Sequence, residues 1–578
     1  MNNDKPALLG DEAVALGAIH AGISAAYGYP GTPSTEILQY LIDENAKGGP
    51  LARWCTNEKT AMEAALGVSF AGRRTIVTMK HVGLNVAADP FINGALLGIK
   101  GGLVVAVADD PGMHSSQGEQ DSRFYAFFAL VPCLEPRSQQ EAYDMCREAF
   151  DLSERFHVPV MLRLATRLSH ARAAILASPD NGKQQSAQNP CSKTEDITRW
   201  MLLPAFARRN YAALIAKQKE IRLWSTAHPV NKLELADKSF AVITSGLGGN
   251  YYEENLADLT AARGKAPSRL HIGTYPLPED SIRKLCEEAE EVLVIEEGQP
   301  LIEERLRGIL PQAVKIRGRL GGQASGNSQA GEKDTAATIT RAGELDPDNV
   351  RSALGLPPRK TVLDALSAGN PAKDFTQGTI SGKPLPQRPP QLCQGCPHAD
   401  SYETLNKVVA ALDNTPGHPN VCVTSDIGCY SLGATPPYSA IESIVCMGAS
   451  VGMARGAADA GIPYAFAVIG DSTFIHSGIT ALIDAVEENI PMTLIILDNS
   501  TVAMTGCQKT AFPSEKLKSL ILGTGLDPSH YLELEAKKQL IEENAVKLKK
   551  EAEHHGLSVV VFKRECLEAA RKRLKAGK

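Results

Sequence analysis

The sequence has little of what brings a protein to nucleic acid or into a membrane. Aromatic residues make up 5% of its 578 residues, the formal net charge is −6, and no basic stretch is interleaved with aromatics. This composition argues against nucleic acid or an anionic membrane surface as a partner. The longest apolar run, near residues 96–108, contains Lys100 and is too short to span a bilayer. The opening residues MNNDKPALLGDEA are polar and acidic, unlike a secretory signal, so we expect a cytoplasmic protein.

Internal repeats of solenoid period are absent as well. The chain has twelve cysteines, and in a cytosolic chain of this length they argue against a disulfide framework. They favour free thiols and a metal or cluster site instead. The length is sufficient for about three or four domains.

Residues 464–508 have the pattern of a strand, a helix and a second strand. Apolar runs at 464–469 and 492–497 predict buried strands, and residues 474–488 have helical periodicity. The predicted apolar face of this helix comprises Ile475, Ile479, Leu482, Ile483 and Val486. Both strands of such a unit end at the same sheet edge, where open α/β sheets bind ligands.

Polar residues follow both of these strands. Gly470-Asp471-Ser472 comes after the first, and Asn499-Ser500 after the second. Asp471, Asn499 and a backbone carbonyl near Thr501 suit Mg²⁺, which is held by few protein oxygens and completed by phosphates and water. N–H groups of the helix that follows Ser472 suit a diphosphate. The pattern resembles the thiamine-diphosphate motif, Gly-Asp-Gly followed later by Asn, although two strand ends with turn residues are the simpler alternative.

The remainder of the chain predicts further α/β domains joined by linkers rich in Gly, Pro, Ser and Gln. Strand-like runs occur at residues 25–29, 75–79, 102–108 and 158–164, and again at 240–245, 270–274 and 291–296. We divide the chain into an N-terminal α/β domain (1–172), a linker with a helical connection (173–234), a small α/β domain (235–320), an extended linker (321–392) and a third α/β domain (393–578).

Glu58 is the second candidate for chemistry, because it begins a helix of small residues in NEKTAMEAALG. Thiamine diphosphate needs a carboxyl hydrogen-bonded to N1′ of its pyrimidine, where proton exchange produces the 4′-imine that deprotonates C2. A carboxyl tuned by burial suits such acid–base work. Alone, Glu58 is more typical of a first-turn acid favoured by the helix dipole. Together with Asp471 and Asn499, the catalytic role is favoured.

Matching stretches along nearly the whole chain now identify a family. They are GYPGTPSTEI, NEKTAMEAALG, TMKHVGLN, DDPGMHSSQGEQDSR, TYPLPED, EEGQP, RAGELDP, CQGCPH, SDIGCYSLG and GDSTF…DNSTVAMTGCQ. The chain resembles the alpha subunits of indolepyruvate:ferredoxin oxidoreductases, within the 2-oxoacid:ferredoxin oxidoreductase family. The resemblance implies an α/β thiamine-diphosphate-binding fold. Its doubly wound domains are of pyrimidine type and diphosphate type, and a smaller domain is similar to the transketolase C-terminal domain.

The resemblance also implies roles for individual residues. Glu58 would bind N1′, and Asp471, Asn499 and the Thr501 carbonyl would hold Mg²⁺. Thr32 would lie near the substrate carboxylate, and Arg123 is similar to an arginine that clamps it bidentately, the alternative being a surface arginine in an acidic loop. For Lys80 and His81, a structural role is as plausible as substrate contact. The further cofactor-binding candidates are Gly428, Cys429, Met447, Gly448, Gly470 and Ser472, although a tight helix–strand contact would equally explain Gly448.

Four cysteines match the positions that ligate a [4Fe–4S] cluster in the family: Cys393, Cys396, Cys429 and Cys566. The alternatives are a zinc site of four cysteines and, for Cys566, a spare buried thiol. The remaining cysteines are interpreted as core or incidental thiols.

Many alpha subunits of this kind end in a ferredoxin-like domain, which this sequence does not contain; it ends in a basic helical stretch. The expected partners are a small beta subunit carrying the gamma-type domain, ferredoxin, CoA and the 2-oxoacid, in a hetero-oligomer with paired alpha chains. The first and third domains, from the same or paired chains, would sandwich the cofactor.

The function we expect is oxidative decarboxylation of an aryl 2-oxoacid, of indolepyruvate or phenylpyruvate type, to the acyl-CoA. Electrons would pass through the cluster to ferredoxin. Two alternatives remain: a non-oxidative thiamine-diphosphate-dependent decarboxylase or carboligase, and a non-catalytic subunit that keeps the fold as a scaffold.

Overall fold

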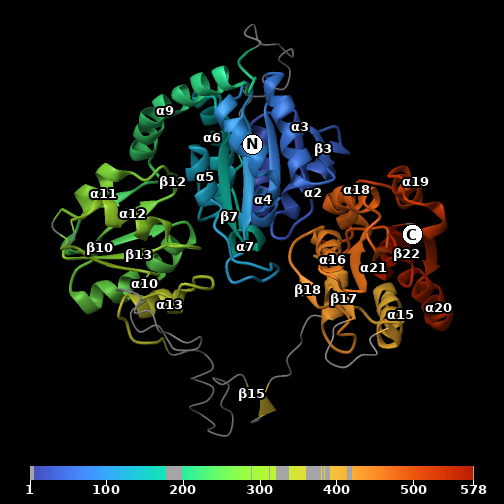
Figure 1. The fold of residues 1–578 in the computed structure, drawn as a ribbon. Helices are drawn as coiled ribbons and strands as arrows, with labels where there is room; N and C mark the ends of the chain where they lie inside the picture. Colours follow the sequence, from blue (N-terminus) through green and yellow to red (C-terminus); the bar gives the residue numbers. More distant parts are fainter. Residues whose placement is uncertain are drawn as a thin grey trace. The chain divides into compact units, whose positions relative to one another are not determined.

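The computed structural model of the chain describes residues 6–177, 198–287, 289–311, 313–320, 338–359, 379–380, 383–384, 391–412 and 420–576. The chain divides into two compact units, Met1–Leu385 and Pro386–Lys578 (Figure 1). Residues 178–197 of the first predicted linker, among them Cys191, and most of the second, 321–392, lie outside the described residues. No helix within the described ranges is long and apolar enough to cross a membrane. The finer division of the chain into five segments stays a prediction.

A seven-stranded sheet forms the centre of the first unit, in the order β12-β6-β7-β5-β4-β2-β3. All neighbours are parallel except β12, which pairs antiparallel with β6. Every residue of β4, β5 and β7 is buried, as expected of parallel strands covered on both faces. The strands are β2 (Ala25–Gly28), β3 (Leu51–Trp54), β4 (Thr75–Lys80), β5 (Leu103–Asp109), β6 (Cys133–Leu134), β7 (Val160–Ala165) and β12 (Thr274–Tyr275).

Helices pack on both faces of this sheet (Figure 1). They are α1 (Gly10–His20), α2 (Thr35–Asn45), α3 (Glu58–Phe70), α4 (His81–Leu97), α5 (Arg123–Ala129), α6 (Gln139–Phe156), α7 (Thr166–His170) and α9 (Pro204–Ala227). The strands and helices predicted for this part of the chain are confirmed, with boundaries that differ by one to a few residues.

A smaller five-stranded sheet, in the order β14-β13-β10-β11-β9, completes the first unit. Its strands are β9 (Leu233–Glu234), β10 (Asp237–Ser245), β11 (Pro267–Ile272), β13 (Glu291–Ile295) and β14 (Lys315–Arg317), with helices α10 (Leu247–Arg263), α11 (Glu279–Leu285), α12 (Leu301–Ile309) and α13 (Pro347–Ala353). The predicted strand at 270–274 overlaps β11 but is interrupted, because the chain leaves the small sheet after Ile272. It then contributes β12 to the large sheet, so the two sheets share one continuous segment.

The second unit is built on six parallel strands in the order β18-β17-β19-β20-β22-β21. The strands are β17 (Val421–Ser425), β18 (Ser443–Ile444), β19 (Tyr464–Gly470), β20 (Met492–Asp498), β21 (Tyr531–Glu535) and β22 (Ser558–Lys563). Its main helices are α15 (Pro397–Leu412), α16 (Ala449–Asp459), α18 (Ile479–Glu487), α19 (Leu517–Gly523), α20 (Ile541–Ala552) and α21 (Leu567–Ala576). The predicted strands at 464–469 and 492–497 are confirmed, and they lie side by side in the sheet as β19 and β20.

The helix between β19 and β20 departs from the prediction. It begins as α17 (Asp471–Thr473), widens into a π-helical turn, η2 (Phe474–Gly478), and continues as α18. The wider turn rotates the following residues, so that Ile483 is 51% exposed and the prediction that it faces the core is wrong. Such π turns occur frequently at functional sites.

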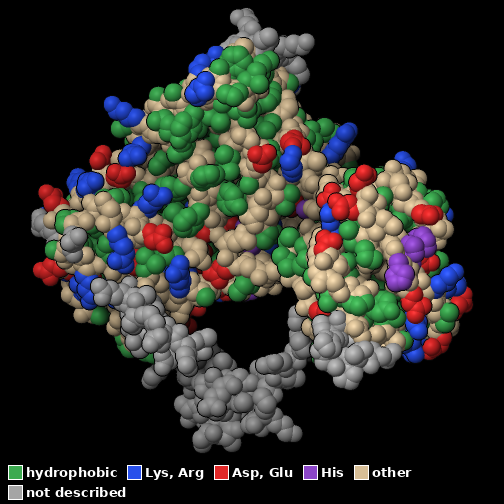
Figure 2. Space-filling model, viewed as in Figure 1, with side chains coloured by type: hydrophobic (Ala, Val, Ile, Leu, Met, Phe, Trp, Pro, Cys, Tyr) green, Lys and Arg blue, Asp and Glu red, His purple; other side chains and the backbone are tan. Residues whose placement is uncertain are grey.

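Charged side chains of both signs are scattered among apolar and neutral ones over the visible face of the molecule (Figure 2). The more unusual charges lie inside the first unit. Arg163 on β7 pairs with Asp109 on β5 at 2.7 Å, and also with Glu135 next to β6. All three side chains are at most 4% exposed, so the large sheet carries ionic contacts within its core.

Replacing Arg163 by Met should destabilise the first unit by about 3–5 kcal/mol, because two carboxylates would be left buried without their cation. The effect is measured as the shift of the urea-induced unfolding transition, followed by hydrogen exchange of peptides from β5 and β7.

The matched control is Arg155→Ala on α6, whose 3.2 Å pair with Glu220 is more than half exposed at both ends. This change should cost less than about 1 kcal/mol. Equal shifts for the two variants would contradict the structural role of the buried pair.

Candidate functional site

Glu58 is the first residue of α3 and is held at the start of that helix. Asn57 caps the helix, with its side chain accepting a hydrogen bond from the Thr60 N–H at 2.8 Å. Glu58 is only 5% exposed, and its carboxyl lies against Gly83 of α4. A Cβ at Gly83 would stand 2.5 Å from Oε1 of Glu58. Glycine at this position therefore makes room for a buried carboxyl between two helices.

Thr32, Lys80 and Ser115 meet at the carboxyl edge of the large sheet. Lys80 ends β4, and its Nζ donates a hydrogen bond to the Ser115 carbonyl at 2.7 Å. The Ser115 hydroxyl donates in turn to the Thr32 carbonyl at 3.2 Å. The structure thus joins two residues that were singled out separately, and adds Ser115, which lies in the matching stretch DDPGMHSSQGEQDSR but was assigned no role.

Burial dominates the electrostatics of this edge. It lowers the pKa of Lys80 to about 8, with the nearby Asp110 carboxylate acting in the opposite direction. Burial also lowers the pKa of His81, whose Nε2 lies 3.1 Å from the Gly118 carbonyl. An amine whose pKa is near 8 exchanges its proton readily, and a bound anion would favour its charged form.

Arg123 has a different environment from the one expected of a substrate clamp. Its guanidinium is fully buried and pairs with Asp121 at 2.6 Å and with Glu296, the residue after β13, at 3.0 Å. Its remaining bonds run to the Tyr275 hydroxyl and to two backbone carbonyls. All five N–H groups are engaged, so this arrangement leaves none for a substrate carboxylate. Arg123 ties the large sheet to the small one in this structure, and its role as a substrate clamp stays a prediction.

In the second unit, acidic and amide side chains gather where β19 and β20 end. Asp471 follows β19 directly, and burial raises the pKa of its carboxyl well above the usual value, with the carboxylate of Asp498 as the next cause. Oδ1 of Asn499 accepts a hydrogen bond from the Thr501 N–H at 3.2 Å. The neighbouring parallel strands therefore bring Asp471, Asn499 and Thr501 together, and they add Asp498, which sequence reasoning missed.

These residues fit a magnesium ion with a diphosphate. Two buried carboxyls in mutual repulsion would be relieved by a divalent cation, and the hydroxyl of Ser472 is buried without a hydrogen-bond partner. Among the described residues, no three His, Cys, Asp or Glu side chains form a metal-binding group. A site of one carboxylate, one amide and one carbonyl is not of that kind, because Mg²⁺ takes its other ligands from phosphates and water.

The glycines of the site border a buried tyrosine and the π turn. A Cβ at Gly428 or Gly470 would collide with the ring of Tyr430, whose hydroxyl donates to the buried Asp426. Gly448 has a φ of +85°, and a Cβ there would lie 2.5 Å from the Cβ of Ser477 in η2. Gly448 is thus tightly packed, but against a helical turn and not in the helix–strand contact given as the alternative explanation. Met447 is half-buried beside it.

The four predicted cluster cysteines are near one another. The pKa of Cys429 is raised to about 12, first by burial and then by the thiols of Cys396, Cys566 and Cys393. A fifth thiol, Cys507, lies next to Cys566 and forms a hydrogen bond with it. The sequence interpretation of Cys507 as incidental overlooked this, because no spacing links it to the other four.

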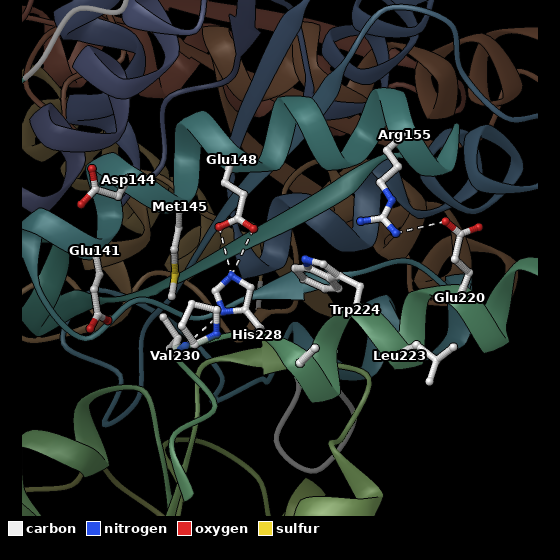
Figure 3. A pocket seen from close by; sticks show the side chains of 12 residues that line it. Glu141, Asp144, Met145, Glu148, Arg155, Glu220, Leu223, Trp224, His228 and Val230 are labelled. Carbon is white, nitrogen blue, oxygen red and sulfur yellow. Dashed lines mark hydrogen bonds and ion pairs between the residues drawn. The ribbon is translucent and has the colours of Figure 1, made fainter.

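A separate cavity of about 660 Å³ lies between α6 and α9 in the first unit (Figure 3). Its walls include Glu141, Asp144, Glu148, Glu220 and Trp224, and Glu148 pairs with His228 at 3.0 Å. Glu220 pairs with Arg155, which also lines the cavity, so cationic and anionic side chains alternate on its walls.

Comparison with known proteins gives matches over nearly the whole chain. Residues 16–212 match the family described as pyruvate flavodoxin/ferredoxin oxidoreductase, thiamine diP-bdg, and residues 426–577 match the thiamine pyrophosphate enzyme, C-terminal TPP binding domain. The thiamine-diphosphate-binding α/β fold expected from the sequence is therefore confirmed.

Two relatives match this chain over most of their own length. The indolepyruvate oxidoreductase subunit IorA of Archaeoglobus fulgidus is 35% identical over 577 residues, covering 97% of this chain and 86% of the relative. The corresponding subunit of Methanothermobacter thermautotrophicus is 33% identical, covering 98% and 87%. A solved 2-oxoglutarate:ferredoxin oxidoreductase from Magnetococcus marinus is 16% identical, covering 54% of this chain and 62% of that one; its TM-score of 0.45 is too low to carry an argument.

The lowered pKa of Lys80 can be measured directly by NMR of protein labelled with ¹³C at lysine Cε. The Lys80 resonance, identified by its absence from Lys80→Met, should titrate with a midpoint near pH 8. Exposed lysines in the same spectra should titrate near 10.4. A midpoint for Lys80 close to that of the exposed lysines would contradict the desolvated environment.

Proposed function

The chain belongs to the family of indolepyruvate oxidoreductase IorA subunits, thiamine-diphosphate-dependent 2-oxoacid:ferredoxin oxidoreductases, and from this premise we propose its substrate, site residues and electron path. The substrate is an aryl 2-oxoacid of indolepyruvate or phenylpyruvate type, converted to CO₂ and the acyl-CoA. The observation that carries the assignment of residues is the set of buried oxygens at Asp471 and Asn499, inside the segment that matches the thiamine pyrophosphate enzymes.

The residues of the second unit bind and orient the cofactor in this proposal. Asp471, Asn499 and the Thr501 carbonyl hold Mg²⁺, and the unpartnered Ser472 hydroxyl faces the diphosphate. Bound thiamine diphosphate supplies the acceptor for the electron pair that CO₂ leaves behind.

The residues of the first unit handle the proton and the substrate. Glu58 holds a proton at N1′ of the pyrimidine, where a carboxyl shielded from water is effective in acid–base exchange. Thr32 and Lys80 lie at the sheet edge where open α/β sheets receive ligands, and the ammonium of Lys80 suits a 2-oxoacid carboxylate. In this proposal Arg123 is part of the framework, which its pairs with Asp121 and Glu296 support.

Cys393, Cys396, Cys429 and Cys566 hold a [4Fe–4S] cluster in this proposal. Their proximity supports it, and thiolates are the usual ligands of such clusters. Each thiolate of a cubane binds a different iron, so the four sulfur atoms need not converge on one point as they do around zinc. A bound cluster accepts single electrons. A small beta subunit and ferredoxin complete the assembly, in which electrons leave the chain.

Glu58→Gln should leave the affinity for thiamine diphosphate within about threefold while turnover falls by about 10²–10⁴-fold, because the amide cannot exchange the proton at N1′. Cofactor binding is measured by calorimetry, and turnover by the reduction of a viologen dye with indolepyruvate and CoA.

The control is Glu63→Gln on the same helix, where Glu63 is exposed and pairs only with Lys59 at the surface. It should behave as the unmodified protein. Near-normal turnover of the Glu58 variant would overturn the assignment of Glu58.

Anaerobically purified protein should contain about four irons and four acid-labile sulfides per chain, with a paramagnetic signal after reduction by dithionite. Cys429→Ser should lose most of this iron, because the cluster would lack one thiolate. Cys422→Ser, on β17 and outside the cysteine group, should keep it. Zinc in place of iron would contradict the proposal and favour a non-oxidative decarboxylase, which releases an aldehyde without any electron acceptor.

A further inference from the structure

His398 is a buried histidine that the site as described so far does not use. It is the second residue of α15 and follows Cys396 and Pro397 directly. Only 3% of it is exposed, and its ring stands edge-on to that of Tyr430, with the centroids 6.2 Å apart. Its Nε2 lies 3.1 Å from Nδ2 of Asn499.

The direction of this hydrogen bond follows from the other end of the Asn499 amide. Oδ1 of Asn499 accepts from the Thr501 N–H at 3.2 Å. If the amide were turned over, its NH₂ group would oppose that N–H, and two donors would meet. Nδ2 therefore donates to Nε2 of His398, which acts as an acceptor, and the ring carries its proton on Nδ1. The Thr501 N–H and His398 thus hold the two ends of the amide in one orientation, with Nδ2 toward His398 and Oδ1 toward Thr501.

Asn499 is held a second time through its backbone. Its carbonyl accepts a hydrogen bond from the N–H of Cys566 at 3.2 Å. One residue therefore contacts both chain segments that carry outlying cysteines of the group. The first segment contains Cys393 and Cys396 and ends at His398, and the second contains Cys566.

We propose that His398 is a positioning residue that orients the Asn499 amide toward Mg²⁺ and thereby couples binding of the metal–diphosphate group to occupation of the cysteine site. The inference rests on the proposed function, because it takes Asn499 as a magnesium ligand and the cysteines as cluster ligands. A cluster that draws Cys396 and Cys566 into fixed positions also fixes the two contacts of Asn499. Such coupling is reciprocal: thiamine diphosphate with Mg²⁺ binds more tightly to the cluster-loaded chain, and the cluster is retained better with the cofactor bound.

The test measures the affinity for thiamine diphosphate at fixed Mg²⁺ by calorimetry, on the purified holoenzyme and on the same protein freed of iron by a chelator. Removal of the cluster should weaken binding by about 5–150-fold, the usual range of coupling between two sites. His398→Leu should weaken binding to the loaded enzyme by about 10–100-fold, as loss of a partner that orients a metal ligand does. It should also reduce the effect of the cluster on affinity.

Two further variants separate positioning from packing. His398→Gln keeps an acceptor oxygen and should recover most of the affinity, whereas His398→Asn is too short to reach Asn499 and should behave as His398→Leu. Glu403→Gln, an exposed change on the same helix, should have no effect. If His398→Leu does not fold, the comparison of the Gln and Asn variants decides.

Different results would overturn the role of His398 and the proposed function. If the unmodified protein binds neither thiamine diphosphate nor iron, the proposed function is overturned. If it binds both, but His398→Leu and His398→Asn bind the cofactor as tightly as the unmodified protein, the positioning role is overturned alone. Equal cofactor affinity with and without the cluster would overturn the coupling.

Discussion

The repulsion between Asp471 and Asp498 is the constraint on which the site in the second unit depends. Parallel pairing of β19 and β20 places the two carboxyls at adjacent strand ends, and burial keeps water from screening them. Within the described part of the chain, neither carboxylate pairs with a lysine or an arginine side chain; the Asp498 carboxylate accepts hydrogen bonds from Ser500 and Ser514. The charge is therefore balanced either by a proton on Asp471 or by a cation from outside the protein.

The first unit also buries carboxylates, but there arginine side chains lie beside them. Its buried carboxylates at Asp109, Asp121, Glu135 and Glu296 lie beside two arginines of the chain, Arg123 and Arg163, each of which pairs with more than one of them. A buried carboxylate that pairs with an arginine of the same chain is structural, and removing the arginine is costly. A buried carboxylate that has no cationic partner in the protein can bind a cation from outside. This difference supports a structural role for Arg123, which the resemblance assigned to the substrate, and a binding role for Asp471.

The sequence predicted the strand–helix–strand unit and its polar strand ends because those depend on local periodicity and on the common edge of parallel strands. It did not predict the π turn, since η2 has the same apolar spacing as an ordinary helix over so few residues. It could not assign β12 to the large sheet, because strand partners are set by long-range packing. Cys507 and His398 lie in the matching stretches DNSTVAMTGCQ and CQGCPH, but no spacing assigned them a role until the fold brought them to Cys566 and Asn499.

Asn499 lies where the requirements of the two proposed sites intersect, and this position has a chemical consequence. Decarboxylation without an electron acceptor leads to aldehyde, which is the reaction of the non-oxidative alternative. If Asn499 is oriented for Mg²⁺ only when both cysteine segments are fixed, a chain that lacks iron also binds its cofactor weakly. Aldehyde formation is then suppressed at the step of cofactor binding, before the substrate reacts. The selectivity for oxidation then depends on how the Asn499 amide is oriented.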